Sequence, residues 1–232
     1  MMRVAVIVPS FNEAATVGSV VSDVVHLGYD AIVVDDASAD NTAEAAKIDG
    51  ATVIRLATNL GIGGAVQTGL RYALLLDYDY IVQVDGDGQH DPNAIPLLLA
   101  PLIDGTADFV VGSRFMGTPQ GYLPPPLRRL GIAWLSILMG RRIRDVTSGF
   151  RAMSRQSALM LLSDYPTDYP EPVTLLRALR SGLVVKEVAA AMKPRLHGVS
   201  SIVLTRYFSY LTRASLGLLV EYTVSSKRSL EP

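Results

Sequence analysis

The amino-acid sequence predicts an α/β fold, a Rossmann-like three-layer α/β/α arrangement around a mostly parallel sheet. The expected strands are short and almost entirely apolar, as at residues 4–8, 31–34 and 109–111. Strands without a polar face are typical of sheets that are covered on both sides. They alternate with helical segments, and strands joined through helices run parallel. Polar residues follow each strand, which is where ligands of such sheets bind.

The expected elements follow one another in order along the chain. Further strands are expected at residues 52–56 and 80–84, and helices at 13–27, 40–47, 61–76 and 92–103. Asn12 is placed to cap the first of these helices. In the second half, the pattern predicts a loop rich in Pro and Gly at residues 118–126 and a helix at 127–139. A strand is expected at 183–188, a second loop at 193–201, and a C-terminal helix after that loop.

Composition narrows the class of protein. The chain has 232 residues, 49% of them hydrophobic, a net charge of −1 and no cysteine. Near-neutral charge gives no indication of a nucleic-acid partner, and the absence of cysteine excludes disulfides and thiolate metal sites. The apolar run at the N-terminus is too short for a secretion signal. The longest apolar region, residues 202–224, is interrupted by Arg206, Arg213 and Glu221, so we expect a cytoplasmic protein.

The strongest motif is DGDGQH at residues 85–90. Asp85 and Asp87 stand two residues apart on extended chain, so their carboxylates point the same way. Gln89 adds a third oxygen, and an all-oxygen site of this kind suits Mg²⁺ or Mn²⁺. Such a metal would stabilise a diphosphate leaving group. The alternative is an ordinary polar turn, because Asp-Gly is a common turn dipeptide.

Two further segments point to a nucleotide. Asp36 follows the second strand and could accept hydrogen bonds from a base or ribose, while Ser38 or Asp40 could cap the next helix. Asn59 begins a glycine-rich stretch, NLGIGG, that opens a helix. Its amides could face a phosphate, although close packing of a helix on the sheet explains the glycines better.

Arginines cluster in the second half. Eight of them fall within residues 114–155, where Asp145 is the one acid. They are interspersed with apolar side chains, which fits a lipid phosphate or an anionic membrane surface; a solvated helix face is the alternative. The C-terminal helix could lie in a membrane interface, or dock on the domain or on a second subunit of a homodimer.

Taken together, the motifs resemble those of the family 2 inverting glycosyltransferases with a GT-A fold. The chain is most similar to the branch that makes dolichyl- or polyprenyl-phosphate sugars. The resemblance rests on six motifs in one order, namely VPSFNE at residues 8–13, VDDAS at 34–38, the Asn59 glycine loop, DGDGQH at 85–90, GSRF at 112–115 and DVTSGFR at 145–151. It implies a GT-A domain over residues 1–200, with a nucleotide-binding half at 1–115 and an acceptor half at 116–200, and a C-terminal helix and tail at 201–232.

The resemblance also implies roles for the matching residues. The nucleotide would be held by Pro9, Ser10, Asn12, Glu13, Asp36, Asn59, Gly61, Asp85 and Gly86. The metal ligands would be Asp85, Asp87 and Gln89. The acceptor or its phosphate would be bound by Arg114, Arg128, Arg129, Ser148, Arg151 and His197. Asp87 and Arg114 would be catalytic residues. Glu171 is a further candidate, which lies near the position where the branch often has a glutamate and this chain has Val173.

The implied reaction is an in-line displacement that moves a sugar from a GDP- or UDP-sugar to an acceptor with inversion. A lipid phosphate is already anionic, whereas a saccharide hydroxyl would need a base, for which Glu171 and Asp168 are the candidates. Residues 9–13 argue against a sugar-phosphate nucleotidyltransferase, and the length and Arg114 argue against a receiver-like domain. An inactive family member that only binds nucleotide remains an alternative. Some family members have two C-terminal transmembrane helices, which this sequence does not show. We therefore expect a cytoplasmic protein or, as the alternative, one that contacts the inner face of the membrane peripherally.

Overall fold

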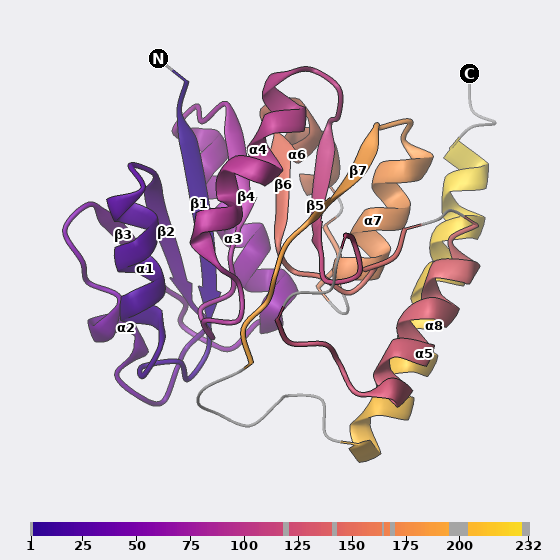
Figure 1. Ribbon diagram of the computed structural model, residues 1–232, viewed down its shortest axis with the longest axis horizontal. Coiled ribbons are helices and arrows are strands. Elements are labelled where there is room, and N and C mark those ends of the chain that lie inside the picture. The colour runs from indigo at the N-terminus through magenta and orange to yellow at the C-terminus, as the bar shows by residue number, and fades with distance from the viewer. Residues whose placement is uncertain are drawn as a thin grey trace.

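The computed structural model describes residues 2–117, 121–140, 143–163, 165–167, 170–194 and 204–228. Within these ranges, seven strands form one sheet in the order β3-β2-β1-β4-β6-β5-β7 (Figure 1). All neighbours run parallel except β6, which is antiparallel to β4 and β5. The strands are β1 Val4–Ser10, β2 Asp30–Asp35, β3 Ala51–Arg55, β4 Tyr80–Gln83, β5 Phe109–Ser113, β6 Arg151–Ser154 and β7 Val185–Ala189.

Helices cover both faces of the sheet and give three layers. One core joins the sheet to α1 and α4, and the other joins it to α3, α5, α6, α7 and α8. Their bounds are α1 Val17–His26, α2 Thr42–Ala45, α3 Gly61–Leu75, α4 Ile95–Ile103 after the short η1 Pro92–Ala94, α5 Pro126–Leu138, α6 Arg155–Leu162, α7 Pro170–Arg180 and α8 Leu204–Arg228.

The strand β1 shows why the sequence folds this way. Every residue of β1 is buried. Ala5 and Ile7 belong to one core, whereas Val4, Val6 and Val8 belong to the other. Successive side chains of a strand point to opposite faces, so an unbroken apolar run supplies both layers. The prediction of a sheet covered on both faces is therefore confirmed.

Two expectations about helix caps need correction, and residues 151–162 had no predicted element. Those residues form the reversed strand β6 and the helix α6. Asn12 does not cap the first helix, which begins at Val17. Asn12 instead has a φ of 56° and accepts a hydrogen bond from the Ala39 N–H. The residue that precedes α2 is Asn41 rather than Ser38 or Asp40, and Asp40 contacts the helix start from one position further upstream, where its carboxylate accepts the Thr42 N–H at 3.0 Å.

The C-terminal helix α8 packs on the domain beside α5, as Figure 1 shows. Ala214 and Leu218 are fully buried, and the Glu221 carboxylate pairs with Arg177 of α7. Docking of this helix on the domain is therefore confirmed. In the part of the chain that the structure describes, no helix combines the length and apolarity needed to span a bilayer.

Candidate active site

The first part of the site forms where β1 and β2 end side by side. Ser10 and Asp35 are partners in register, and the Asp36 N–H donates to the Ser10 carbonyl oxygen at 2.9 Å. The Gly86 N–H donates to the Pro9 carbonyl oxygen at 3.2 Å. A Cβ atom on Gly86 would lie 2.2 Å from the Ser10 hydroxyl oxygen, so the close approach of the two loops requires glycine at this position.

The segment after β1 joins the loop after β2 to the loop after β4. The Asn12 N–H donates to the Ser38 hydroxyl at 2.9 Å, and the Glu13 N–H donates to Thr42 Oγ1 at 2.8 Å. The Thr16 hydroxyl, next to the Glu13 carboxylate, donates to the Gly86 carbonyl oxygen at 2.8 Å. The structure therefore brings the residues expected to bind nucleotide into one connected group.

Asp36 holds the glycine loop in this group. Its carboxylate accepts the Leu60 N–H at 2.7 Å, and its carbonyl oxygen accepts a hydrogen bond from the Asn59 side chain at 3.2 Å. Burial raises the pKa of Asp36, although hydrogen bonds from the Leu60 and Gly61 amides act in the opposite direction. The loop at residues 59–61 thus stands beside the end of β2 through contacts made by Asp36.

The glycines of α3 serve packing, as the sequence analysis favoured. A Cβ atom on Gly63 would lie 2.4 Å from the carbonyl oxygens of Pro166 and Thr167, and one on Gly69 would lie 2.5 Å from the Ile7 side chain. Gly69 therefore brings α3 onto β1. Gly63, by contrast, packs against a loop from the second half rather than against the sheet.

The loop after β4 carries the two aspartates, and we call residues 85–90 the carboxylate loop. Asp87 is 8% exposed, and its Oδ1 accepts the Gln89 N–H at 3.0 Å. Asp85 Oδ1 accepts a hydrogen bond from the Gln83 side chain at 3.2 Å. The Gln89 side chain donates to the Lys193 carbonyl oxygen at 3.4 Å. Both carboxylates are therefore fixed by short contacts within the loop and with β4.

His90, the last residue of the carboxylate loop, holds the backbone at the start of that loop. It is buried, and its Nδ1 lies 3.0 Å from the Asp85 backbone nitrogen, which donates to it. The imidazole stacks on Phe150 with ring centroids 5.0 Å apart. Because Nδ1 is an acceptor here, the neutral ring carries its proton on Nε2. His90 belongs to the DGDGQH motif, but no role was predicted for it.

A second support comes from the segment after β7. Residue 192 forms isolated bridges with His90 and with Gly121. The Lys193 N–H donates to the Gln89 carbonyl oxygen at 2.8 Å, and the Tyr122 N–H donates to the Met192 carbonyl oxygen at 2.7 Å. These backbone contacts were beyond sequence reasoning, because they depend on where β7 ends relative to β4.

The donor set of the carboxylate loop fits a magnesium or manganese ion that arrives with a diphosphate. Asp85 and Asp87 offer carboxylate oxygens at an edge where nucleotide-binding segments meet. Among the described residues, no group of three or more His, Cys, Asp or Glu side chains could hold a metal. Mg²⁺ is commonly held by one or two carboxylates together with substrate phosphates and water, so two protein carboxylates are sufficient for this purpose.

Arg114 lies at the end of β5 in a buried ion pair. Its Nε and Nη2 donate to the two carboxylate oxygens of Asp145 at 2.7 and 2.6 Å, and Nη2 also donates to the Thr147 hydroxyl at 3.1 Å. Burial alone would lower the pKa of Arg114, but Asp145 holds that pKa above its ordinary value. Arg114 is therefore a fixed cation, 11% exposed.

Ser148 and Arg151 lie in the interior, which corrects the expectation that they face the acceptor. The Ser148 hydroxyl donates to the Gly112 carbonyl oxygen at 2.7 Å. Arg151 is 1% exposed and donates to the carbonyl oxygens of Ser148 and Glu171, both at 2.7 Å. These two residues therefore contact backbone carbonyl oxygens inside the domain, and Arg151 Nη1 is buried without a hydrogen-bond partner among the residues that the structure describes.

The remaining residues expected at the acceptor side lie in different places. Glu171 lies in the first turn of α7, and burial raises the pKa of its carboxyl while nearby Arg151 lowers that pKa. Arg128 and Arg129 lie in the first turn of α5, where Arg129 is exposed. His197 and Asp168 fall outside the described residues.

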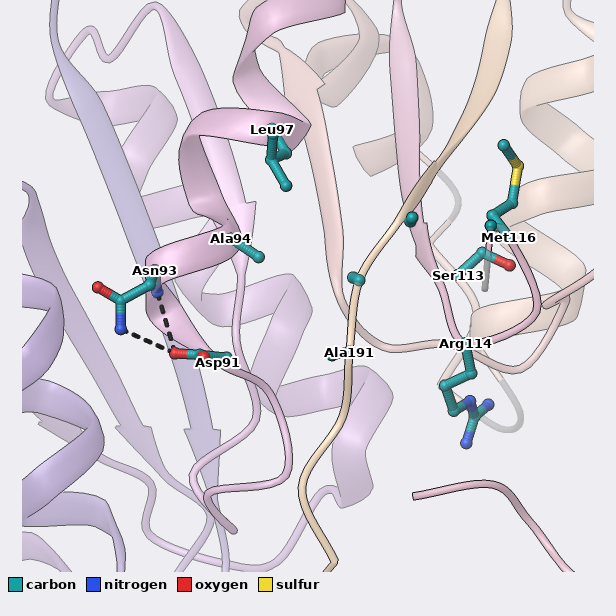
Figure 2. Close-up of a pocket in the computed structure, with 11 residues that line it drawn as sticks. Asp91, Asn93, Ala94, Leu97, Ser113, Arg114, Met116 and Ala191 are labelled. Atoms are coloured by element: carbon teal, nitrogen blue, oxygen red, sulfur yellow. Dashed lines mark hydrogen bonds between the residues drawn. The ribbon is translucent and has the colours of Figure 1, made fainter. Parts of the chain in front are cut away.

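Beside the carboxylate loop lies a cavity of about 460 Å³. Figure 2 shows it between η1 and α4 on one side and the ends of β5 and β7 on the other. Leu97 and Met116 point towards it from opposite walls, and Arg114 lies at its lower end. The lining is Asp91, Asn93, Ala94, Leu97, Ser113, Arg114, Met116, Gly117 and Ala189 to Ala191.

A mostly parallel α/β sheet with two carboxylates after β4 and a fixed arginine after β5 is the arrangement expected of a nucleotide-dependent transferase. The sequence profile of glycosyl transferase family 2 matches residues 5–161. The chain therefore belongs to glycosyl transferase family 2, and it is a glycosyltransferase that uses a nucleotide-sugar donor. The family expected from the motifs is confirmed.

Three proteins similar to this chain have names that refer to the transfer of a sugar to a dolichyl, polyprenyl or undecaprenyl carrier. The UDP-N-acetylglucosamine–dolichyl-phosphate N-acetylglucosaminyltransferase of Methanococcus voltae is 30% identical over 94% of this chain and 91% of its own length. The polyprenol monophosphomannose synthase of Mycolicibacterium smegmatis is 31% identical over 86% of this chain and 81% of its own length. The undecaprenyl-phosphate mannosyltransferase of Micrococcus luteus is 37% identical over 65% and 66% of the two chains.

A solved structure confirms the GT-A fold. Glucosyl-3-phosphoglycerate synthase from Mycobacterium tuberculosis, crystallised with Mn²⁺, UDP and phosphoglyceric acid, matches with a TM-score of 0.74. The match covers 95% of this chain and 78% of that chain at 22% identity. At this identity, the match establishes the arrangement of helices and strands.

Proposed function

We propose that this glycosyltransferase uses Mg²⁺ or Mn²⁺ to move a sugar from a nucleotide diphosphate to a polyprenyl phosphate, with inversion at the anomeric carbon. The observation that carries the proposal is the meeting of three groups at one sheet edge. These are the connected nucleotide segments around Asp36, the carboxylate pair Asp85 and Asp87, and the fixed cation Arg114. The acceptor class is supported by the names of three similar proteins, which act on dolichyl, polyprenol or undecaprenyl phosphates.

Each group has a distinct task in the displacement. The loops that end β1, β2 and β4 hold the nucleoside and place its diphosphate at Asp85 and Asp87. A divalent ion bound there supplies positive charge to the departing nucleotide diphosphate. Arg114 binds the acceptor phosphate and holds one of its oxygens in line with the bond that breaks. Arg128 and Arg129 of α5 provide further positive charge for that phosphate.

An acceptor phosphate oxygen is already anionic, so the displacement requires no proton transfer. Transfer to a saccharide hydroxyl is the second candidate, and the half-buried carboxyl of Glu171 near Arg151 is the observation that favours it. In that case Glu171 would take the hydroxyl proton. The two candidates differ in pH dependence, because only the second requires an ionised Glu171 for turnover.

A nucleotide screen tests the donor half of the proposal. The protein is heated with GDP, UDP or their sugars, each with and without Mn²⁺, and the melting temperature is recorded. We expect one nucleotide to stabilise the fold only when metal is present, by about 2.7 kcal/mol at a hundred times its Kd. If no nucleotide raises the melting temperature in either condition, the proposed donor site is wrong.

We also propose that the enzyme works at a membrane surface, through exposed apolar side chains of α5 and α8. On α5 they recur at positions that share one face of the helix. The acid Glu221 of α8 is buried against Arg177, whereas Arg129 and Arg213 are exposed. Apolar and cationic groups without exposed acid suit an anionic lipid surface. The exposed apolar residues are Leu127, Leu130, Trp134 and Ile137 of α5 and Phe208, Leu216, Leu219 and Val220 of α8.

Sedimentation with lipid vesicles tests the membrane surface. The double variant Leu130→Glu/Ile137→Glu is expected to bind phosphatidylglycerol vesicles about tenfold more weakly, because it loses apolar area and gains negative charge. The control is Leu75→Glu, since Leu75 is 78% exposed on α3 and lies outside the proposed surface. Equal binding by both variants and the parent protein would contradict this assignment.

A further inference from the structure

Arg114 and Asp145 form the most completely buried ion pair at the edge of the proposed acceptor site. Asp145 is 0% exposed and accepts from three donors of a single residue. These are the Arg114 N–H at 3.0 Å, Nε at 2.7 Å and Nη2 at 2.6 Å. A carboxylate removed from water costs free energy unless such partners satisfy it. The geometry therefore commits Asp145 to Arg114 rather than to a ligand.

We propose that Asp145 is a positioning residue for acceptor binding, which fixes the direction of the Arg114 guanidinium without touching the acceptor. The inference rests on the proposed function, in which Arg114 binds the acceptor phosphate. A guanidinium held by two parallel hydrogen bonds keeps one plane and one orientation. Arg114 reaches the acceptor already ordered, so binding does not pay the rotamer entropy of a long side chain.

Contacts on the far side of Asp145 keep the pair in place. The Glu187 carboxylate of β7 accepts the Arg144 N–H at 2.8 Å and the Asp145 N–H at 2.9 Å. Since β7 pairs in parallel with β5, and Arg114 follows β5, the loop at residues 144–147 is tied to two adjacent strands. Thr147 adds a third contact, because its hydroxyl oxygen accepts a hydrogen bond from Arg114 Nη2.

This arrangement separates two effects that substitutions can distinguish. Asp145 touches Arg114, whereas Glu187 touches the backbone of the same loop and not Arg114. A change at Asp145 alters the orientation and net charge of the Arg114 pair. A change at Glu187 loosens the loop while leaving the carboxylate opposite Arg114 in place. If Asp145 served only to hold the loop, both substitutions would have similar consequences.

The test compares Asp145→Asn with Glu187→Gln in steady-state kinetics, with a short-chain polyprenyl phosphate in detergent as acceptor. For Asp145→Asn we expect the acceptor KM to rise about tenfold, the cost of losing one charge-assisted contact. The Kd of the nucleotide diphosphate with Mn²⁺ should stay within about twofold of the parent value. For Glu187→Gln the acceptor KM should change less than about threefold. An equal rise in both variants would overturn the inference.

A double-variant comparison then shows whether Asp145 acts through Arg114. Arg114→Gln should raise the acceptor KM more than Asp145→Asn, and adding Asp145→Asn to it should change that KM by less than about threefold. Full additivity would overturn the role of Asp145. An unchanged KM in Arg114→Gln alone would instead overturn the acceptor role of Arg114. If Asp145→Asn does not fold, Thr147→Val supplies the measurement, with a smaller rise of about threefold expected from the lost hydroxyl contact.

Discussion

Replacing Asp87 with asparagine is expected to lower turnover about a thousandfold, the effect of removing several kcal/mol of stabilisation from the departing diphosphate. Asparagine has the same shape and can still accept the Gln89 N–H that Asp87 Oδ1 accepts at 3.0 Å. The substitution therefore removes negative charge at the proposed metal position and preserves the loop. Initial rates at saturating donor, together with the melting temperature with and without Mn²⁺, measure the effect.

Asp104→Asn is the matched control for this substitution. Asp104 is an exposed aspartate that follows α4, so its variant loses the same charge on the surface and should keep the parent rate. Asp87→Asn should melt at nearly the parent temperature without ligand, and Mn²⁺ with nucleotide should no longer raise that temperature. Metal-dependent turnover in Asp87→Asn would show that the ion is bound elsewhere.

The parts of this site that could be predicted from the sequence are those encoded in neighbouring residues. The carboxylate loop follows a strand that was recognisable from its apolar pattern. The same holds for the strands β1, β2 and β5, because an apolar run of β-branched residues needs no distant partner to be recognised. The expectation that Asp85 and Asp87 stand on extended chain is wrong, because β4 ends at Gln83 and residues 86–88 form a turn, so their spacing alone does not set the relative direction of the two carboxylates.

The parts that could not be predicted depend on residues that are far apart in the chain. Arg114 finds its partner Asp145 thirty-one residues later, and His90 stacks on Phe150. The strand β6 begins at the buried residue Arg151, which donates to the carbonyl oxygens of residues 148 and 171 and lies over the Phe109 ring. Charged residues are almost never fully buried unless paired. The sequence alone therefore predicts an exposed arginine at this position.

Asn12 illustrates a local signal with two outcomes. Asparagine is common at helix caps and also tolerates positive φ. In this fold the Asn12 side chain accepts the N–H of Ala39, a residue of the loop after β2, at 2.9 Å. This contact places Asn12 in the second of these roles. The tertiary contact joins two nucleotide-side loops and outweighs the local preference for a cap, so the helix begins at Val17 instead.

Gly149 offers a direct way to disturb Asp85 without touching its chemistry. A Cβ atom on Gly149 would lie 2.9 and 3.0 Å from the two Asp85 carboxylate oxygens and 3.2 Å from the Gln83 side-chain nitrogen. These distances are shorter than ordinary van der Waals contacts, so the Asp85 side chain must move in Gly149→Ala. The fold should tolerate the change at a cost of about 1 kcal/mol, since the displaced atoms end a side chain.

The expected result for Gly149→Ala is a loss of about a hundredfold in turnover, the usual consequence of moving a reacting group by about 1 Å. Gly217→Ala is the control, because its added Cβ would lie 3.2 Å from the Val173 side chain, a similar crowding between α7 and α8. That variant should lose stability and keep its turnover per folded molecule. Thermal melts and initial rates on both proteins separate the two effects. Parent-like turnover in Gly149→Ala would mean that the position of Asp85 does not govern the reaction, since the carboxylate cannot keep its place beside an added methyl group.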